Sequence, residues 1–127
     1  MATILIADDH ALLRSSLVRI FTSSGHRVLQ ADDGQVALEQ VAQVCPDVLL
    51  LDIRMPRLGG LEVLQEIRTR GLPIAVVVMS AEAGGVQGRS MTAAKALGAD
   101  ALLAKPFGLD EILGVLEGLV DVGDQAS

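Results

Sequence analysis

Apolar residues in this chain are grouped in two patterns that alternate along its length. Four short runs are continuously apolar and rich in branched side chains, which is typical of strands covered on both faces. These runs lie at residues 4–7, 48–51, 74–79 and 101–104. A weaker run, Val28 and Leu29 with Ala31, supplies one further strand. The first pattern therefore predicts five strands.

In the second pattern, apolar residues recur three and four positions apart, as on one face of a helix. This spacing predicts helices over residues 13–21, 38–44, 61–67 and 109–120, with a weaker one over 91–97. Glycine or proline marks the joins where an element should end: Gly25, Gly34, Gly59, Gly60, Gly71, Pro73 and Gly98. Five strand-helix pairs in succession predict an α/β fold with a parallel sheet.

Length and composition are consistent with one domain. We expect it to span residues 1–120, followed by a polar tail or the start of a linker at 121–127. No apolar run approaches the roughly 18 residues of a membrane span, and acidic residues interrupt the amino end before a signal-peptide core could form, so a cytoplasmic location is expected. The net charge of −6 disfavours contact with nucleic acid or anionic lipid. Cys45, before Pro46, is expected to serve packing rather than reactivity.

Polar residues close three of the predicted strands. Asp8 and Asp9 follow the first run, Asp52 follows the run at 48–51, and Lys105 follows the last. The carboxyl ends of parallel strands meet at one edge of a sheet, and ligands bind there in open α/β folds. We therefore expect these side chains to share one cavity.

The chemistry of this set points to a phosphoryl group. Three carboxylates in one place repel one another unless positive charge intervenes, and Mg²⁺ is a cation that prefers oxygen ligands, often with a phosphate oxygen among them. Lys105 offers a second positive charge on the opposite side of the cavity, and the Ser80 hydroxyl offers a hydrogen bond. For Asp8 and Asp9 alone, an acidic helix start is the competing interpretation.

As a set, these residues resemble the receiver domain of bacterial response regulators over about residues 3–120. The resemblance implies a (βα)5 flavodoxin-like three-layer sandwich, with a five-stranded parallel sheet in the order 2-1-3-4-5. Turn residues after Asp52 add to the match. The residues that carry the resemblance are Asp8, Asp9, Asp52, Met55, Pro56, Gly59, Gly60, Ser80, Ala81, Lys105, Pro106 and Phe107.

The resemblance implies that Asp52 takes a phosphoryl group from a sensor histidine kinase or a phosphotransfer protein. Asp9 would then bind Mg²⁺ directly, Asp8 would assist, and Asp52 and the main-chain carbonyl of Arg54 would complete the protein ligands. Lys105 would bind the phosphoryl charge. Such a protein is a signalling phosphoacceptor with at most slow self-dephosphorylation, rather than an enzyme.

The resemblance also implies a switch. Ser80, with its small neighbour Ala81, would move toward the phosphoryl group and pull the glycine-bearing loop at 83–88, and the bond between Lys105 and Pro106 would be cis. The signal would pass to a downstream protein or to a covalently linked output domain, with a phosphorylation-dependent dimer as a further option.

Two positions bear on this switch. Leu102 stands where the family usually has Tyr or Phe, so either Leu102 repacks without a ring flip or the output surface lies elsewhere. Arg54 and Glu82, two places beyond Asp52 and Ser80, occupy positions that tune the lifetime of the phosphoryl group in the family, and we expect them to pair over the site.

Other functional classes remain open from the sequence. A Mg²⁺-dependent phosphatase of the haloacid-dehalogenase type also forms an aspartyl phosphate, but it requires an acid at the place of Arg54. A flavodoxin-like cofactor binder requires a neutral phosphate loop where this chain has Asp8 and Asp9. A receiver-like interaction module that never accepts phosphate is the third alternative.

Overall fold

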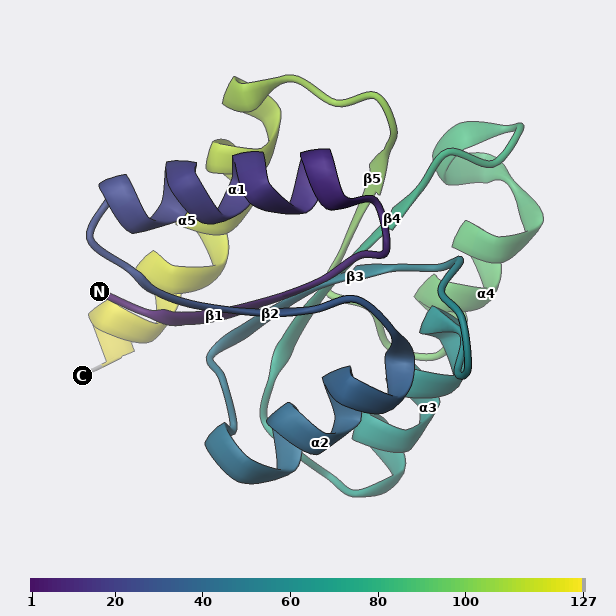
Figure 1. The fold of residues 1–127 in the computed structure, drawn as a ribbon, viewed down its shortest axis with the longest axis horizontal. Coiled ribbons are helices and arrows are strands. Elements are labelled where there is room, and N and C mark those ends of the chain that lie inside the picture. The colour runs from purple at the N-terminus through teal and green to yellow at the C-terminus, as the bar shows by residue number, and fades with distance from the viewer. Residues whose placement is uncertain (127) are drawn as a thin grey trace.

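A parallel sheet with helices on both faces forms the centre of the molecule (Figure 1). The computed structural model describes residues 1–126, and it describes side chains for residues 1–119. The strands are β1 (Thr3–Ala7), β2 (Arg27–Ala31), β3 (Val48–Asp52), β4 (Ala75–Ser80) and β5 (Ala101–Ala104). The helices are α1 (Ala11–Ser23), α2 (Gly34–Val44), α3 (Gly60–Thr69), α4 (Arg89–Ala96) and α5 (Leu109–Ala126), and η1 (Gly85–Gln87) is a short 3-10 helix.

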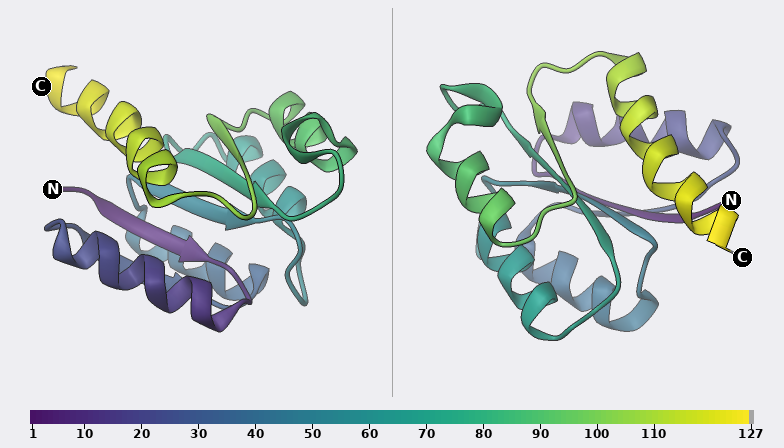
Figure 2. Two further views of the ribbon diagram at one scale, coloured as in Figure 1. Left: turned by 90° about the horizontal axis from the view of Figure 1, so that it is seen from above. Right: turned by 180° about the vertical axis from the view of Figure 1, so that it is seen from behind.

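The strands are hydrogen-bonded in the order β2-β1-β3-β4-β5, and every neighbouring pair is parallel. This confirms the α/β class, the strand order and the three-layer sandwich predicted from the sequence. Helices α1 and α5 cover one face of the sheet, and α2, α3 and α4 cover the other (Figures 1 and 2). The predicted domain boundary at residue 120 falls within α5, and the side chains of residues 120–127 lie outside those described.

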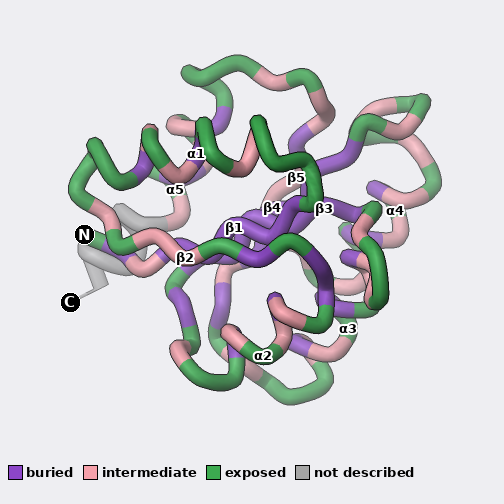
Figure 3. Tube along the Cα trace, viewed as in Figure 1, coloured by how far each residue is buried: buried purple, intermediate pink, exposed green. Residues whose placement is uncertain are grey.

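Alternate residues of each strand supply two separate cores. In β1, Ile4 and Ile6 pack with Phe21 of α1 and Ile112 of α5, whereas Leu5 and Ala7 pack with the helices on the other face. Both sets are fully buried, as the central strands in Figure 3 show. Continuous apolar runs are thus explained by burial on both faces. The cores are almost entirely aliphatic because the chain has two Phe residues, Phe21 and Phe107, and no Trp or Tyr.

Cys45 does not pack as expected. It is exposed and follows the last residue of α2 in a left-handed conformation, with φ at 50°. That conformation is common after a helix end and reverses the chain. The neighbouring Pro46 is the residue that becomes buried. Packing at this corner therefore comes from the proline and not from the thiol.

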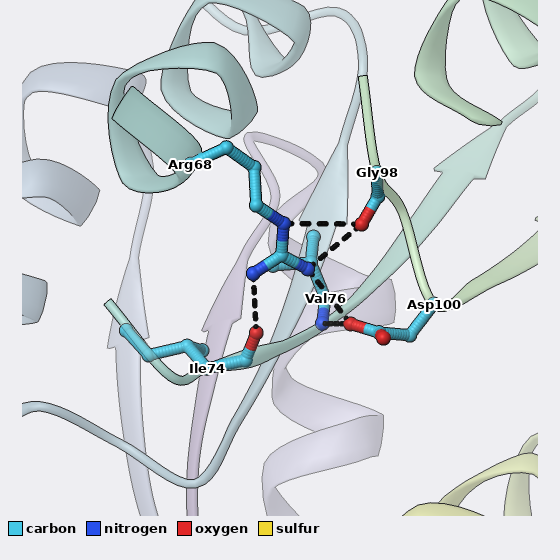
Figure 4. A network of polar contacts seen from close by, with 5 residues as sticks. All are labelled: Arg68, Ile74, Val76, Gly98 and Asp100. Atoms are coloured by element: carbon cyan, nitrogen blue, oxygen red, sulfur yellow. Dashed lines mark hydrogen bonds and ion pairs between the residues drawn. The ribbon is translucent and has the colours of Figure 1, made fainter. Parts of the chain in front are cut away.

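At the amino ends of β4 and β5, the Arg68 side chain joins three segments (Figure 4). From α3, it donates hydrogen bonds to the carbonyls of Ile74 and Gly98 and forms a 2.8 Å ion pair with Asp100. The same Asp100 oxygen accepts the main-chain N–H of Val76 at 2.8 Å. Arg68 thereby fixes the carboxyl-terminal end of α4 to the sheet.

Replacement of Arg68 by alanine is expected to lower the free energy of unfolding by about 2 kcal/mol, because two carbonyls and a carboxylate lose a charged donor. Arg70→Ala is the matched control, since among the side chains described for residues 1–119 Arg70 pairs only with Glu66, an exposed residue one helical turn away. Its replacement should cost less than about 0.5 kcal/mol. Urea unfolding measures both values. Equal losses in the two variants would contradict the assigned role of Arg68.

Candidate functional site

The three predicted acids meet at the carboxyl-terminal edge of the sheet. Asp8 and Asp9 follow β1, and Asp52 is the last residue of β3. One carboxylate oxygen from each lies within 4.8 Å of the other two. Asp8 and Asp52 are buried, whereas Asp9 is exposed to solvent. The structure thus brings together the acids that the sequence placed at separate strand ends.

Asp8 does not cap α1. That helix begins after His10, and a carboxylate oxygen of Asp8 accepts the His10 main-chain N–H at 2.8 Å. His10 is exposed and also lines the cavity at the site. The acidic pair therefore precedes the helix, and its carboxylates remain available to the site.

Lys105 lies among the acids. Its ammonium nitrogen is 2.7 Å from an Asp8 oxygen and 3.5 Å from an Asp52 oxygen. The main-chain N–H of Lys105 donates to the Ser80 carbonyl at 2.7 Å, which fixes the residue beside the end of β4. The bond from Lys105 to Pro106 is cis, as the resemblance implies. One cation thus bridges two carboxylates.

An open cavity of about 610 Å³ lies over these groups. Its walls come from the ends of β1, β3, β4 and β5, and its lining residues are Asp9, His10, Asp52, Arg54, Ser80, Ala81, Glu82, Ala83 and Lys105. A smaller, mainly apolar cavity of about 280 Å³ adjoins it beside Pro106 and Phe107. The first cavity has room for a phosphoryl group with its hydration.

The pKa of the Asp52 carboxyl is raised from 3.8 to about 6, first by burial and then by the negative charges of Asp8 and Asp9, while Lys105 acts in the opposite direction. The folded protein therefore binds more protons at this site than the unfolded chain between these two values. By linkage, stability falls as the pH rises through that interval. Without a metal, the ionised Asp52 destabilises the fold at neutral pH.

Asp52→Asn should consequently stabilise the metal-free protein above pH 6 and have little effect below pH 4. The pKa difference corresponds to up to about 3 kcal/mol, which water in the open cavity reduces to about 1–2 kcal/mol. Urea unfolding between pH 4 and pH 8, with a chelator present, measures this difference. A stabilisation that is the same at pH 4 and pH 8 would refute the electrostatic origin.

Two residues that the sequence indicated do not contact each other. Among the described side chains, Arg54 and Glu82 form no ion pair, although both line the cavity. A Glu82 carboxylate oxygen instead accepts the Ser90 hydroxyl at 2.6 Å. The expected pairing over the site is therefore absent, because Glu82 is held by α4.

Leu102 and Arg14 complete the surroundings. Leu102 is half-buried and packs against the core beneath α2, α3 and α4, on the opposite sheet face from Leu103.

Arg14 was missed from the sequence: its guanidinium donates to the Asp8 carbonyl at 2.7 Å and to the Gln30 side chain at 3.0 Å. Its position one turn after His10 is the signal that could have indicated a role beside Asp8.

Comparison with known proteins decides the family. The model of the response regulator receiver domain matches residues 4–117, which is most of the chain. The chain belongs to the response regulator receiver domain family. Response regulator MprA of Mycobacterium leprae is 42% identical over 117 residues, and that of Mycobacterium ulcerans is 41% identical. The match covers 92% of this chain and 50% and 49% of those relatives, so this receiver domain spans about half of their length.

Solved structures agree with the family. The N-terminal domain of an uncharacterized protein from Wolinella succinogenes has a TM-score of 0.92 at 31% identity and covers both chains completely. The receiver domain of a putative response regulator, NarL, from Mycobacterium tuberculosis has a TM-score of 0.80 at 32% identity, covering 97% of this chain and 96% of that one. The receiver fold is therefore shared with these structures.

Proposed function

We propose that this receiver domain accepts a phosphoryl group on Asp52 from the phosphohistidine of a sensor histidine kinase or phosphotransfer protein. The observation that carries the proposal is the meeting of Asp52 with Asp8, Asp9 and Lys105 in one open cavity. Asp52 is largely buried, yet it lines that cavity, so a donor can reach its carboxylate.

The donor set fits Mg²⁺. It offers only oxygen from the side chains, and three carboxylates face one ammonium group, which leaves excess negative charge that a divalent cation would balance. Asp8, Asp9, Asp52 and the main-chain carbonyl of Arg54 would hold the ion. When bound, Mg²⁺ would offset charge on the phosphoryl oxygens.

In the transfer, one oxygen of the Asp52 carboxylate attacks phosphorus in line with the leaving imidazole nitrogen. The new P–O bond forms as the P–N bond breaks, and the imidazole takes the bonding electron pair and then a proton. Lys105 turns its ammonium group to an oxygen of the transferred group, where its charge favours the transition state. Ser80 supplies a hydroxyl to another oxygen.

The phosphorylated domain would act on a downstream protein, on a covalently linked output domain, or by forming a dimer. Receiver domains belong to signalling proteins, and this one is proposed as an acceptor with at most slow self-dephosphorylation. No helix among residues 1–126 is long and apolar enough to cross a membrane. We propose that the domain works in the cytoplasm without direct contact with nucleic acid, given its net charge of −6.

The test is incubation of the protein with a small acyl phosphodonor, with Mg²⁺ or with a chelator, followed by intact-mass measurement and peptide mapping. One added phosphoryl group on the peptide that contains Asp52, dependent on Mg²⁺ and lost in mild base, is the expected result. No mass gain would support the phosphorylation-independent interaction module instead. Turnover of donor without a stable adduct would support the phosphatase.

A further inference from the structure

Two hydrogen bonds connect the cavity to the amino end of α4. The Ser80 hydroxyl oxygen accepts the main-chain N–H of Glu82 at 3.0 Å. The Glu82 carboxylate in turn accepts the hydroxyl of Ser90, in the first turn of α4, at 2.6 Å. From these contacts we propose that Glu82 and Ser90 form a link that carries the arrival of a phosphoryl group at Asp52 to α4. The inference rests on the proposed function.

Helix α4 depends on Glu82 for negative charge at its amino end. The helix begins after Gly88, which has no side chain to cap it, and its first turn contains no acidic residue. A carboxylate near the first turn is favoured by the helix dipole. Because Glu82 belongs to the loop before α4, the charge that stabilises this end comes from the wall of the cavity.

A phosphoryl group on Asp52 would act on Glu82 in two ways. If the Ser80 hydroxyl turns to the phosphoryl oxygen, the Glu82 N–H loses part or all of its acceptor. The phosphoryl group also brings a charge of about −1.5 to −2 into a cavity that Glu82 lines, and like charges repel. Both effects move the Glu82 carboxylate from Ser90 and weaken the first turn of α4.

The loop can follow such a movement. Gly84 and Gly85, between Glu82 and α4, adopt φ values of +94° and +55°, which glycine adopts without strain. Leu102, by contrast, is an aliphatic side chain packed against the core, and it has neither a ring nor a hydroxyl to signal a change. The link through Glu82 therefore offers a route to α4 that requires no aromatic residue at position 102.

The link can be tested by hydrogen exchange at the Thr92 amide, which donates to the Gly88 carbonyl at 2.9 Å in the first turn of α4. In the wild type, phosphorylation confirmed by intact mass is expected to raise its exchange rate at least about 5-fold. In Ser90→Ala, the rate should be raised before phosphorylation and should change less than about 2-fold afterwards. Ser24→Ala, which removes a hydroxyl that donates to Ile20 at the end of α1, should respond like the wild type.

A second set of variants tests whether the two residues act through one contact: Glu82→Ala alone, and Glu82→Ala combined with Ser90→Ala. If the two residues act through one contact, both variants should exchange at Thr92 like Ser90→Ala alone, and additive increases would overturn the link. A Ser90→Ala protein that responds like the wild type would also overturn it, while leaving phosphoryl acceptance intact. A wild type that gains no phosphoryl group would instead refute the proposed function on which the link rests.

Discussion

Asp52→Asn is expected to abolish phosphoryl incorporation, to below about 1% of the wild-type level, because the amide oxygen is a poor nucleophile and carries no negative charge. The variant should fold, since asparagine has nearly the same shape and the change removes a carboxylate whose pKa burial already raises. Intact mass after incubation with Mg²⁺ and a small acyl phosphodonor measures the loss.

Asp47→Asn is the matched control for this substitution. Asp47 lies just before the opposite end of β3, is exposed, and accepts the Thr3 main-chain N–H through its side chain at 2.8 Å. An asparagine there keeps an acceptor oxygen and should leave incorporation unchanged. If the Asp52→Asn protein still incorporated a phosphoryl group at the wild-type rate, the acceptor would be another residue.

Gly60→Ala is expected to lower the free energy of unfolding by about 3 kcal/mol or more, because the added methyl group meets main chain that cannot move aside. A Cβ at Gly60 would overlap the carbonyl oxygen of Asp52 and come within 2.8 Å of the Ile53 Cα. The Gly60 N–H donates to the Ile53 carbonyl at 2.8 Å, which holds α3 against the end of β3. Relief of the overlap would therefore displace the proposed acceptor, and incorporation should fall as well.

Gly114→Ala separates this effect from that of glycine replacement in general. Gly114 lies in α5, is exposed, and an added Cβ would meet nothing within 4 Å. Alanine there should raise the free energy of unfolding by about 0.5–1 kcal/mol, because it loses less conformational freedom than glycine in a helix. Thermal and urea unfolding of both variants give the comparison. If Gly60→Ala were as stable as the wild type, the close contact between α3 and the end of β3 would not exclude a methyl group at position 60.

Strands and their ends could be predicted from the sequence because burial on both faces leaves a continuous apolar run. For the same reason, the meeting of Asp8, Asp52 and Lys105 could be predicted: each follows or ends such a run, and parallel strands align their carboxyl ends. Their functional roles stay predictions until phosphorylation is measured.

Side-chain partners between elements could not be predicted in this way. The contact of Glu82 with Ser90 depends on how the loop at 83–88 folds, and the η1 turn within it has no periodic signal of its own. Arg14 reaches Asp8 only because α1 packs beside β1. Hydrophobic periodicity places elements in a sheet, but it carries no information on which polar groups pair across them.

The Arg68 contacts at the far end of α4 have a mechanical consequence. Gly98 and Asp100, which follow the helix, are held to α3 and β4, whereas the amino end is reached through a glycine-bearing loop. The helix is thus fixed at its carboxyl-terminal end by the Arg68 contacts, whereas its amino end is held by the contact of Glu82 with Ser90, which the proposed link would release. With eight residues, its length is about 12 Å, so a displacement of about 2 Å at the amino end tilts it by about 10°. The solvent-facing side of α4 would then move relative to the sheet, and the movement would be largest near the amino end of the helix.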